Sequence, residues 1–346
     1  LFGTYVPSTA TVGSTYYYAI ATNACNSIAS TPINVQIGGP PTFTLQASGT
    51  PQVVCQNGIV TPFTVAVSSP YYPATVQWGY YDGTGRIAGT GTSYTSSNTA
   101  IGTTGYFVEA INLCGTTYGT RPGSVTVNAL TTISIQPRSS QEVCQNSTPI
   151  TLQVYAGGTS LTYQWYSNTS NSNSGGTPIS GATSSTYVPS TATVGTNYYY
   201  VVVSGTCGVL TSSTSTIAVD APIVITTQPS NQTICQGLSA APISVSITGV
   251  ITTYQWWSST SSPSSGFNPI SGATTSSYTP STTTVGTTWY YLFMNGTCGQ
   301  VKSNIITFIV NPQQATPNHY SVRGNNILSG WVCYSFCHCS FELSVV

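Results

Sequence analysis

The sequence predicts an all-β protein made of tandem sandwich domains, and two observations lead to that fold class. A block of about 90 residues recurs along the 346-residue chain, which is the size of one seven-stranded sandwich. Each block consists of short segments rich in Val, Ile, Thr and Tyr, separated by Gly, Pro, Asn and Ser. No segment has the 3.6-residue period of an amphipathic helix.

The repeat is clearest in a ten-residue motif that precedes a run of aromatic residues and then a cysteine. TYVPSTATVG occurs at residues 4–13 and 186–195, SYTPSTTTVG at 277–286, and the weaker SYTSSNTAIG at 93–102. The following cysteines are Cys25, Cys114, Cys207 and Cys298, and a cysteine followed by glutamine opens a unit at Cys55, Cys144 and Cys235. Cys55, Cys144 and Cys235 are 89 and 91 residues apart, which sets the period.

These spacings divide the chain into five parts. Residues 1–38 form the second half of a repeat, 39–129 a divergent repeat, and 130–221 and 222–311 two further repeats. Because the chain opens in the middle of a repeat, we expect it to be a piece of something longer. Residues 312–346 do not repeat; they are the start of a divergent module or a mis-assigned stretch.

Within residues 130–221 the pattern predicts six strands. The polar stretch 168–183 is expected to be a loop with at most one short edge strand. The predicted strands are 133–136, 150–155, 161–167, 185–188, 197–204 and 209–219.

The near absence of charge excludes several classes of partner. Charged residues make up 3% of the chain, against about 25% in a typical soluble protein, and the formal net charge is zero. A chain without a basic face has nothing to neutralise phosphates or anionic lipid, so nucleic acid is excluded as a partner. No stretch has the ~18 to 20 apolar residues of a membrane span, and we expect no direct membrane insertion.

The cysteines at repeating spacing predict disulfides and an oxidising, extracellular compartment. The expected pairs lie within each repeat, namely Cys55 with Cys114, Cys144 with Cys207 and Cys235 with Cys298. Each bridge is expected to staple one end of its sandwich, because the first cysteine precedes the second strand of the repeat. Cys25 has no partner in its own half unit, so it is expected to be free or bound to another chain.

One tryptophan follows the first cysteine of each complete repeat, at Trp78, Trp165 and Trp256. The order Cys, Trp, Cys is that of immunoglobulin domains, in which this tryptophan is buried. We therefore expect immunoglobulin-like sandwiches with the three tryptophans in their cores.

The repeat motifs also resemble those of a known group of proteins. Cys-Gln, Tyr-Gln-Trp-Tyr-Ser, Pro-Ile-Ser-Gly-Ala-Thr, Tyr-Val-Pro-Ser-Thr-Ala-Thr-Val-Gly and Gly-Thr-Cys-Gly are similar to motifs in the immunoglobulin-like tandem repeats of large Bacteroidota cell-surface adhesins. Those proteins include gliding adhesins and are commonly exported by the type IX pathway. The resemblance covers residues 1–311, although 39–129 lacks Tyr-Gln-Trp and Pro-Ile-Ser-Gly. It implies an extracellular surface protein in which such modules serve as stalks, adhesive arms or filament subunits.

The chain is short of groups for catalysis, so we predict no enzyme and no cofactor. The repeats contain no histidine; both histidines, His319 and His338, lie in the tail. Asp82 and Glu109 share one repeat, and Glu142 and Asp220 share the next. The Asp82-Gly-Thr-Gly stretch predicts a hairpin turn.

The tail holds the one cluster of metal-ligand type. Cys333, Cys337 and Cys339 are the candidate zinc ligands. Their spacing is not that of a familiar zinc knuckle, and disulfides or a divergent module fit it better.

Aromatic residues form the other candidate site, because both faces of the strand before the second cysteine are apolar. One face should line the core, while the other should present an aromatic stripe suited to a partner or a sugar. The alternative is that loops of the same unit cover it. The stripe consists of Tyr16 and Tyr18, of Tyr198 and Tyr200, and of Trp289, Tyr291 and Phe293.

Together these features favour a non-enzymatic structural or adhesive segment of an extracellular surface assembly. Low charge and the aromatic stripe predict homo-oligomers or contacts with other copies of the protein, while glycans and a host or prey surface remain open as partners. The alternative is a carbohydrate-binding or spacer module array of a secreted polysaccharide-degrading protein.

Overall fold

The computed structural model describes residues 3–47, 50–313, 328–335 and 338–344, with side chains described up to residue 313. All the regular secondary structure of the described residues is β-strand, which confirms the predicted all-β fold class. No helix long and apolar enough to cross a membrane occurs among the described residues.

The chain divides into two compact units whose boundary passes through the middle sandwich. The first unit comprises Leu1–Gln136, Val154–Gln164 and Val201–Ser212. The second comprises Pro137–Gln153, Trp165–Tyr200 and Ser213–Val346.

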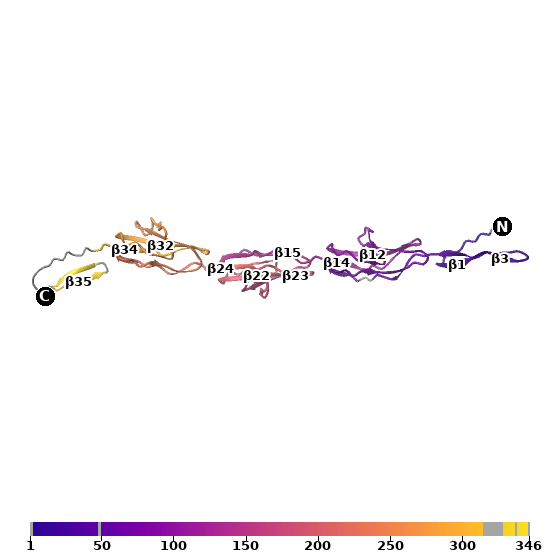
Figure 1. The fold of residues 1–346 in the computed structure, drawn as a ribbon, viewed down its shortest axis with the longest axis horizontal. Helices are drawn as coiled ribbons and strands as arrows, with labels where there is room; N and C mark the ends of the chain where they lie inside the picture. Colours follow the sequence, from indigo (N-terminus) through magenta and orange to yellow (C-terminus); the bar gives the residue numbers. More distant parts are fainter. Residues whose placement is uncertain (1–2, 48–49, 314–327, 336–337, 345–346) are drawn as a thin grey trace. The chain divides into compact units, whose positions relative to one another are not determined.

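The first sandwich packs a six-stranded sheet against short two-stranded pieces (Figure 1). The large sheet has the order β10-β9-β12-β14-β6, with β13 also paired to β12, while β5 pairs with β8 and β7 with β11. The strands are β5 Thr42–Leu45, β6 Gln52–Cys55, β7 Phe63–Thr64, β8 Ala66–Ser68, β9 Thr75–Tyr80, β10 Ile87–Thr90, β11 Ser93–Tyr94, β12 Gly102–Asn112, β13 Gly115–Tyr118 and β14 Ser124–Asn128.

The second and third sandwiches repeat this topology strand for strand. The second has β15 Thr132–Ile135, β16 Ser140–Cys144, β17 Leu152–Gln153, β18 Tyr155–Gly157, β19 Thr162–Asn168, β20 Thr177–Pro178, β21 Thr186–Tyr187, β22 Gly195–Gly205, β23 Gly208–Thr211 and β24 Ser215–Asp220. The third has β25 Val224–Thr227, β26 Gln232–Cys235, β27 Ile243–Ser244, β28 Ser246–Thr248, β29 Ile251–Ser259, β30 Asn268–Pro269, β31 Ser277–Tyr278, β32 Gly286–Gly296, β33 Gly299–Lys302 and β34 Ile306–Asn311.

The tryptophan of each repeat is fully buried, as predicted. Trp78, Trp165 and Trp256 are each 0% exposed. Their indole Nε1–H groups donate to the carbonyl oxygens of Gly91, Ser184 and Thr275 at 2.7, 2.9 and 3.0 Å, respectively. Each tryptophan therefore buries a large apolar ring without leaving its donor unpaired.

Three two-stranded pairs lie outside the sandwiches in the sequence. Residues before the first sandwich form β1 Gly13–Tyr17, paired with β4 Ile33–Ile37, and β2 Ile20–Thr22, paired with β3 Ser27–Ala29. In the tail, β35 Leu328–Ser335 pairs with β36 His338–Ser344.

The predicted strands of the second repeat are largely present, with one omission that matters. Strands β15, β17 to β19 and β21 to β24 fall on the predicted segments, and β20 is the short edge strand of the 168–183 loop. Strand β16, however, lies where no strand was predicted, and it pairs in parallel with β24 from Ser140↔Thr216 to Cys144↔Asp220. The corresponding strands β6 and β26 pair in parallel with β14 and β34.

Candidate functional site: cysteine junctions between repeats

Two disulfides join consecutive repeats. Cys55 is bonded to Cys207, and Cys144 is bonded to Cys298, with Cα–Cα distances of 5.5 and 5.4 Å. In both bridges the Cys-Gln cysteine of one repeat is bonded to the cysteine that follows the long strand of the next repeat. Cys235 is also disulfide-bonded.

The predicted pairing within each repeat is therefore wrong, and the sheet geometry gives the reason. In the first repeat, Cys55 pairs with Asn128 at the end of the sheet where Gly102 pairs with Val127. Cys114 follows Asn112 at the other end of β12. Ten residue steps along a strand span about 33 Å, whereas bridged cysteines need Cα atoms within about 7 Å. The two cysteines of one repeat thus lie at opposite ends of their sandwich. The expected bridge between them, at one end of the sandwich, therefore cannot form.

Among the cysteines whose side chains the structure describes, two are free thiols. Cys25 is free and exposed, as expected for a cysteine without a partner in its half unit. Cys114 is also free and exposed, although it was predicted to be bonded to Cys55. Cys114 occupies the hairpin position that Cys207 and Cys298 occupy in the following repeats.

The glutamine of the Cys-Gln motif anchors its cysteine to two neighbouring segments. The backbone N–H groups of Gln56, Gln145 and Gln236 donate to the carbonyls of Asn128, Asp220 and Asn311, each at 2.9 Å. The side-chain amides of the same residues donate to the carbonyls of Thr99, Ala192 and Thr283 at 2.8, 2.9 and 2.8 Å.

This second set of acceptors explains the repeated motif of the sequence. Thr99, Ala192 and Thr283 lie inside the segments SYTSSNTAIG, TYVPSTATVG and SYTPSTTTVG. The next backbone N–H groups, of Asn57, Asn146 and Gly237, also donate to carbonyls of these segments, at 3.0, 3.0 and 3.2 Å. The motif therefore clamps the Cys-Gln segment and fixes the first cysteine at one end of the sandwich.

The second cysteine stands at the tip of a two-residue hairpin. The flanking pairs are Asn112↔Gly115, Gly205↔Gly208 and Gly296↔Gly299, so each cysteine is the second loop residue. The glycine that follows has φ 141°, 128° or 106°, a conformation that disfavours residues with a Cβ. The Cys-Gly dipeptide thus closes the tight turn that presents the thiol.

At the first junction, hydrogen bonds hold the linker against the hairpin that carries Cys207. The Thr131 N–H donates to the Cys207 carbonyl at 3.4 Å, and the Thr131 hydroxyl donates to the Gly208 carbonyl at 2.8 Å. The Ala129 N–H donates to the Thr159 hydroxyl at 3.0 Å. Thr131 is only 7% exposed, so the backbone linker is packed into the same junction as the disulfide.

The aromatic stripe is covered in the second repeat, contrary to the prediction for Tyr200. Tyr200 is 3% exposed, and its ring stacks on Tyr166 with centroids 5.1 Å apart. The Gly176 N–H donates to the Tyr200 hydroxyl at 3.1 Å, because the loop after β19 folds back over the ring. The Asn168 side chain ties that loop by donating to the carbonyls of Ser172 and Ser174, each at 3.1 Å.

Tyr291 in the third repeat is covered in a related way. Its ring stacks on Trp257 at 6.0 Å, meets the edge of Phe267 at 4.8 Å, and lies 3.9 Å from the Lys302 ammonium. Burial raises the pKa of the Tyr291 hydroxyl. Tyr291 is half-buried, and so are Tyr198, Trp289 and Phe293; of the predicted interface residues only Tyr16 and Tyr18 are widely exposed, at 67% and 60%.

The remaining polar residues do not assemble a reactive centre among the described residues. Asp82 lies in the β9–β10 hairpin, as predicted, and accepts from the Thr84 hydroxyl and N–H and from Arg86. These contacts, with Thr84 contributing most, lower the pKa of Asp82 to about 2. No group of three or more His, Cys, Asp or Glu side chains occurs in the described ranges, and the side chains of Cys333, Cys337 and Cys339 lie outside them.

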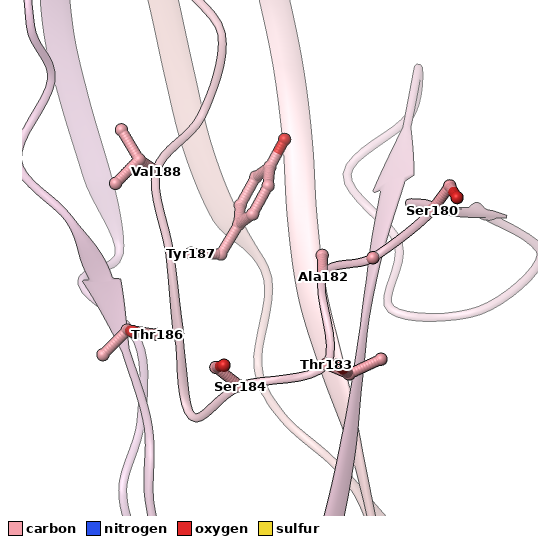
Figure 2. A pocket seen from close by; sticks show the side chains of 8 residues that line it. Ser180, Ala182, Thr183, Ser184, Thr186, Tyr187 and Val188 are labelled. Atoms are coloured by element: carbon pink, nitrogen blue, oxygen red, sulfur yellow. The ribbon is translucent and has the colours of Figure 1, made fainter.

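A small pocket lies in the second repeat beside Tyr187 (Figure 2). The Tyr187 ring also stacks on Trp165, with ring centroids 5.8 Å apart. Its volume of about 260 Å³ is below the ~300 to 1,000 Å³ of ordinary ligand pockets. Its lining carries no charged group; it consists of Ser180, Gly181, Ala182, Thr183, Ser184, Thr186, Tyr187 and Val188.

Comparison with known proteins identifies a family and a fold. Residues 133–221 and 224–312 match a family described as a domain of unknown function (DUF8696). No curated protein matches the chain.

Among solved structures, an E-to-A variant of titin domains I67–I69 is 14% identical, covers 79% of this chain and 99% of its own, and has a TM-score of 0.50. The N-terminal four Ig domains of Dscam1 isoform 6.9 are 16% identical, cover 86% of this chain and 80% of their own, and have a TM-score of 0.37. The titin likeness shows the fold of tandem immunoglobulin-like domains.

Proposed function

The chain belongs to the DUF8696 family, and from its own residues we propose that it is a non-enzymatic structural and adhesive segment of an extracellular surface assembly. The observation that carries this proposal is that both defined disulfides join one repeat to the next. Bridges of this kind add nothing to a catalytic centre; they tie modules into a continuous covalent array.

The same bonds support an extracellular compartment. Disulfides persist in oxidising environments and are rare in the reducing cytosol. The resemblance of the repeat motifs to Bacteroidota surface adhesins supports a location at the cell surface. A chain with 3% charged residues exposes hydroxyls and amides in place of charges, which suits a passive spacer between an anchor and an adhesive tip.

Self-association is part of the proposal, but its surface differs from the one predicted. Tyr200 is covered by a loop of its own repeat, and this removes it as a contact residue and as a sugar platform. Tyr291 is half-buried against Trp257, Phe267 and Lys302 of its own repeat. The half unit presents exposed apolar residues instead: Tyr16, Tyr18, Ile20, Ile28 and Ile33 are each 59% to 71% exposed. Apolar side chains exposed to this degree offer a contact surface to a second copy of the chain.

Peptide mapping of the protein recovered from its native cell surface without reduction tests the main proposal. We expect peptides in which Cys55 is joined to Cys207 and Cys144 to Cys298. Recovery of these cysteines as free thiols, or of the protein from the cytosol, would contradict an extracellular structural role.

Analytical ultracentrifugation of the full chain in low and molar salt tests self-association separately. Because the proposed contacts are apolar, the oligomer should persist in molar salt and dissociate when Tyr16 and Tyr18 are both replaced by serine. Tyr118→Ser, at a site 70% exposed in the first repeat, is the matched control. A monomer in both salts would leave a structural array without self-assembly.

A further inference from the structure

We propose that the junction disulfides make this array a tether that hardly lengthens when its repeats unfold. The inference rests on the proposed structural function and adds a mechanical property to it. It follows from where the four cysteines of the bridges Cys55–Cys207 and Cys144–Cys298 lie along the chain and at which end of each sandwich.

At each junction two covalent links join the neighbouring repeats, namely the backbone and one disulfide. The second repeat is held at one end by the backbone at Thr131 and by Cys207, and at the other end by Cys144 and by the backbone at Asp220. The segments 131–144 and 207–220 therefore form two short covalent paths between the two ends. The residues between Cys144 and Cys207 carry no tension.

These two paths are already nearly extended in the folded state. One contains β15 and β16 and the other contains β23 and β24, while the long strand β22 spans about 33 Å between the same ends. Each path advances by about 13 residues, which reach at most about 45 Å when fully stretched. Unfolding the second repeat alone would thus add only about 10 Å to the tether.

The same limit applies to the repeats on either side. If the first repeat unfolds alone, tension runs through residues 40–55 and across the bridge to Cys207. If the third repeat unfolds alone, tension runs across the bridge to Cys298 and through residues 298–311. Simultaneous unfolding of the second and third repeats extends only segments 131–144 and 298–311, instead of the whole stretch 131–311.

The bridges also change how force acts on the sheet. Strands β16 and β24 are parallel neighbours, and Cys144 and Asp220 are paired at their common end. Without bridges, force enters through β15 and leaves through β24, which shears the hydrogen bonds between β16 and β24. With bridges, both strands are held at both ends and are stretched side by side, so their hydrogen bonds carry little shear. Force does work on a molecule only by lengthening it, so tension would hardly accelerate unfolding of a bridged repeat.

Single-molecule force spectroscopy of the full chain, pulled by its two ends, tests the proposal. The oxidised chain should show no single release as long as a repeat of about 90 residues, or about 300 Å. The reduced chain should show releases of that length, about a twentyfold to thirtyfold larger gain for each repeat. The double variant C25S/C114S, which removes the free thiols of Cys25 and Cys114 and leaves both junction bridges in place, should behave as the oxidised chain does.

The double variant C55S/C207S gives the sharpest outcome. It should release the first repeat, residues 40–128, while the second and third repeats stay limited by Cys144–Cys298. One added release of about 300 Å is therefore expected. Repeat-length releases in the oxidised parent chain, with the bridges verified by peptide mapping, would overturn the proposal. That result would leave the extracellular structural role intact, because the role depends on location and bonding rather than on the load path.

Discussion

Removing one junction disulfide should destabilise the two repeats that it joins and leave the remaining repeat unchanged. The perturbation is the double variant C55S/C207S, which deletes the bridge without leaving a free thiol. While the second repeat stays folded, the bridge closes a loop over residues 55–128 of the unfolded first repeat. Closing a loop of about 70 residues is worth about 4 kcal/mol in the chain-entropy account, and delivered values are often smaller.

The second repeat should lose less than the first. When the second repeat is unfolded and its neighbours are folded, the Cys55–Cys207 bridge closes a loop over residues 131–207. The Cys144–Cys298 bridge closes another loop that overlaps it, so part of the entropy loss of the unfolded chain remains when Cys55–Cys207 is removed. The expected order of destabilisation is therefore first repeat, then second repeat, with no effect on the third. Loss of a bridge confined to a single repeat would destabilise that repeat alone.

Native-state hydrogen exchange with mass spectrometry resolves this order, because β12, β22 and β32 report the three repeats. A loss of about 4 kcal/mol accelerates exchange about a thousandfold, since each 1.4 kcal/mol is a factor of ten. Peptides from β12 should accelerate most, those from β22 less, and those from β32 should match the parent. Faster exchange in β32, or in β12 alone, would refute the reasoning, and C25S/C114S provides the control.

Four further outcomes are expected. Without reductant, a maleimide should label Cys25 and Cys114 but not Cys55, Cys144, Cys207 or Cys298, as read by peptide mapping. Gln145→Ala should lower the free energy of unfolding of the second repeat by about 1 kcal/mol in denaturant titrations, because its amide clamp on the Ala192 carbonyl is lost; Gln153→Ala on exposed β17 is the control. Tyr200→Ser should destabilise the second repeat by roughly 3 kcal/mol and leave the sedimentation of the folded chain unchanged, since the ring is buried against Tyr166. Thr84→Ala should raise the pKa of Asp82 from about 2 towards 3.8 in an NMR titration; in the parent, the small stabilisation from this carboxylate is present above pH 3.8 and is lost as the pH falls towards 2.

The sequence was sufficient to predict the repeats, most strands and the buried tryptophans, because each depends on a local pattern. It was insufficient for β16, and the physical reason is a buried polar residue. Gln141 is 7% exposed where an alternating strand would carry an apolar side chain, and its amide group exchanges two hydrogen bonds with the backbone of Ile150. A buried glutamine satisfied in this way breaks the apolar alternation on which strand prediction depends.

Missing β16 led directly to the wrong disulfides. Without that strand, Cys144 had no fixed place in the sheet, and pairing within the repeat was the simplest arrangement. The parallel pairing of β16 with β24 places Cys144 at the end of the sandwich opposite Cys207. Equal spacing along the chain was compatible with bridges within repeats and between them, and only the strand register separates the two.

The first repeat shows which features of the sequence the junction depends on. Its motif SYTSSNTAIG departs from TYVPSTATVG, and it lacks Tyr-Gln-Trp and the Pro-Ile-Ser-Gly loop. Yet Gln56 still clamps its cysteine through the carbonyl of Thr99, as Gln145 does through that of Ala192. The acceptor is a backbone carbonyl, so the side chain at that position is free to vary while the cysteine keeps its place. The requirement shared by all three repeats is therefore the placement of two thiols at opposite ends of a sandwich, which a covalently tied array needs and a binding pocket does not.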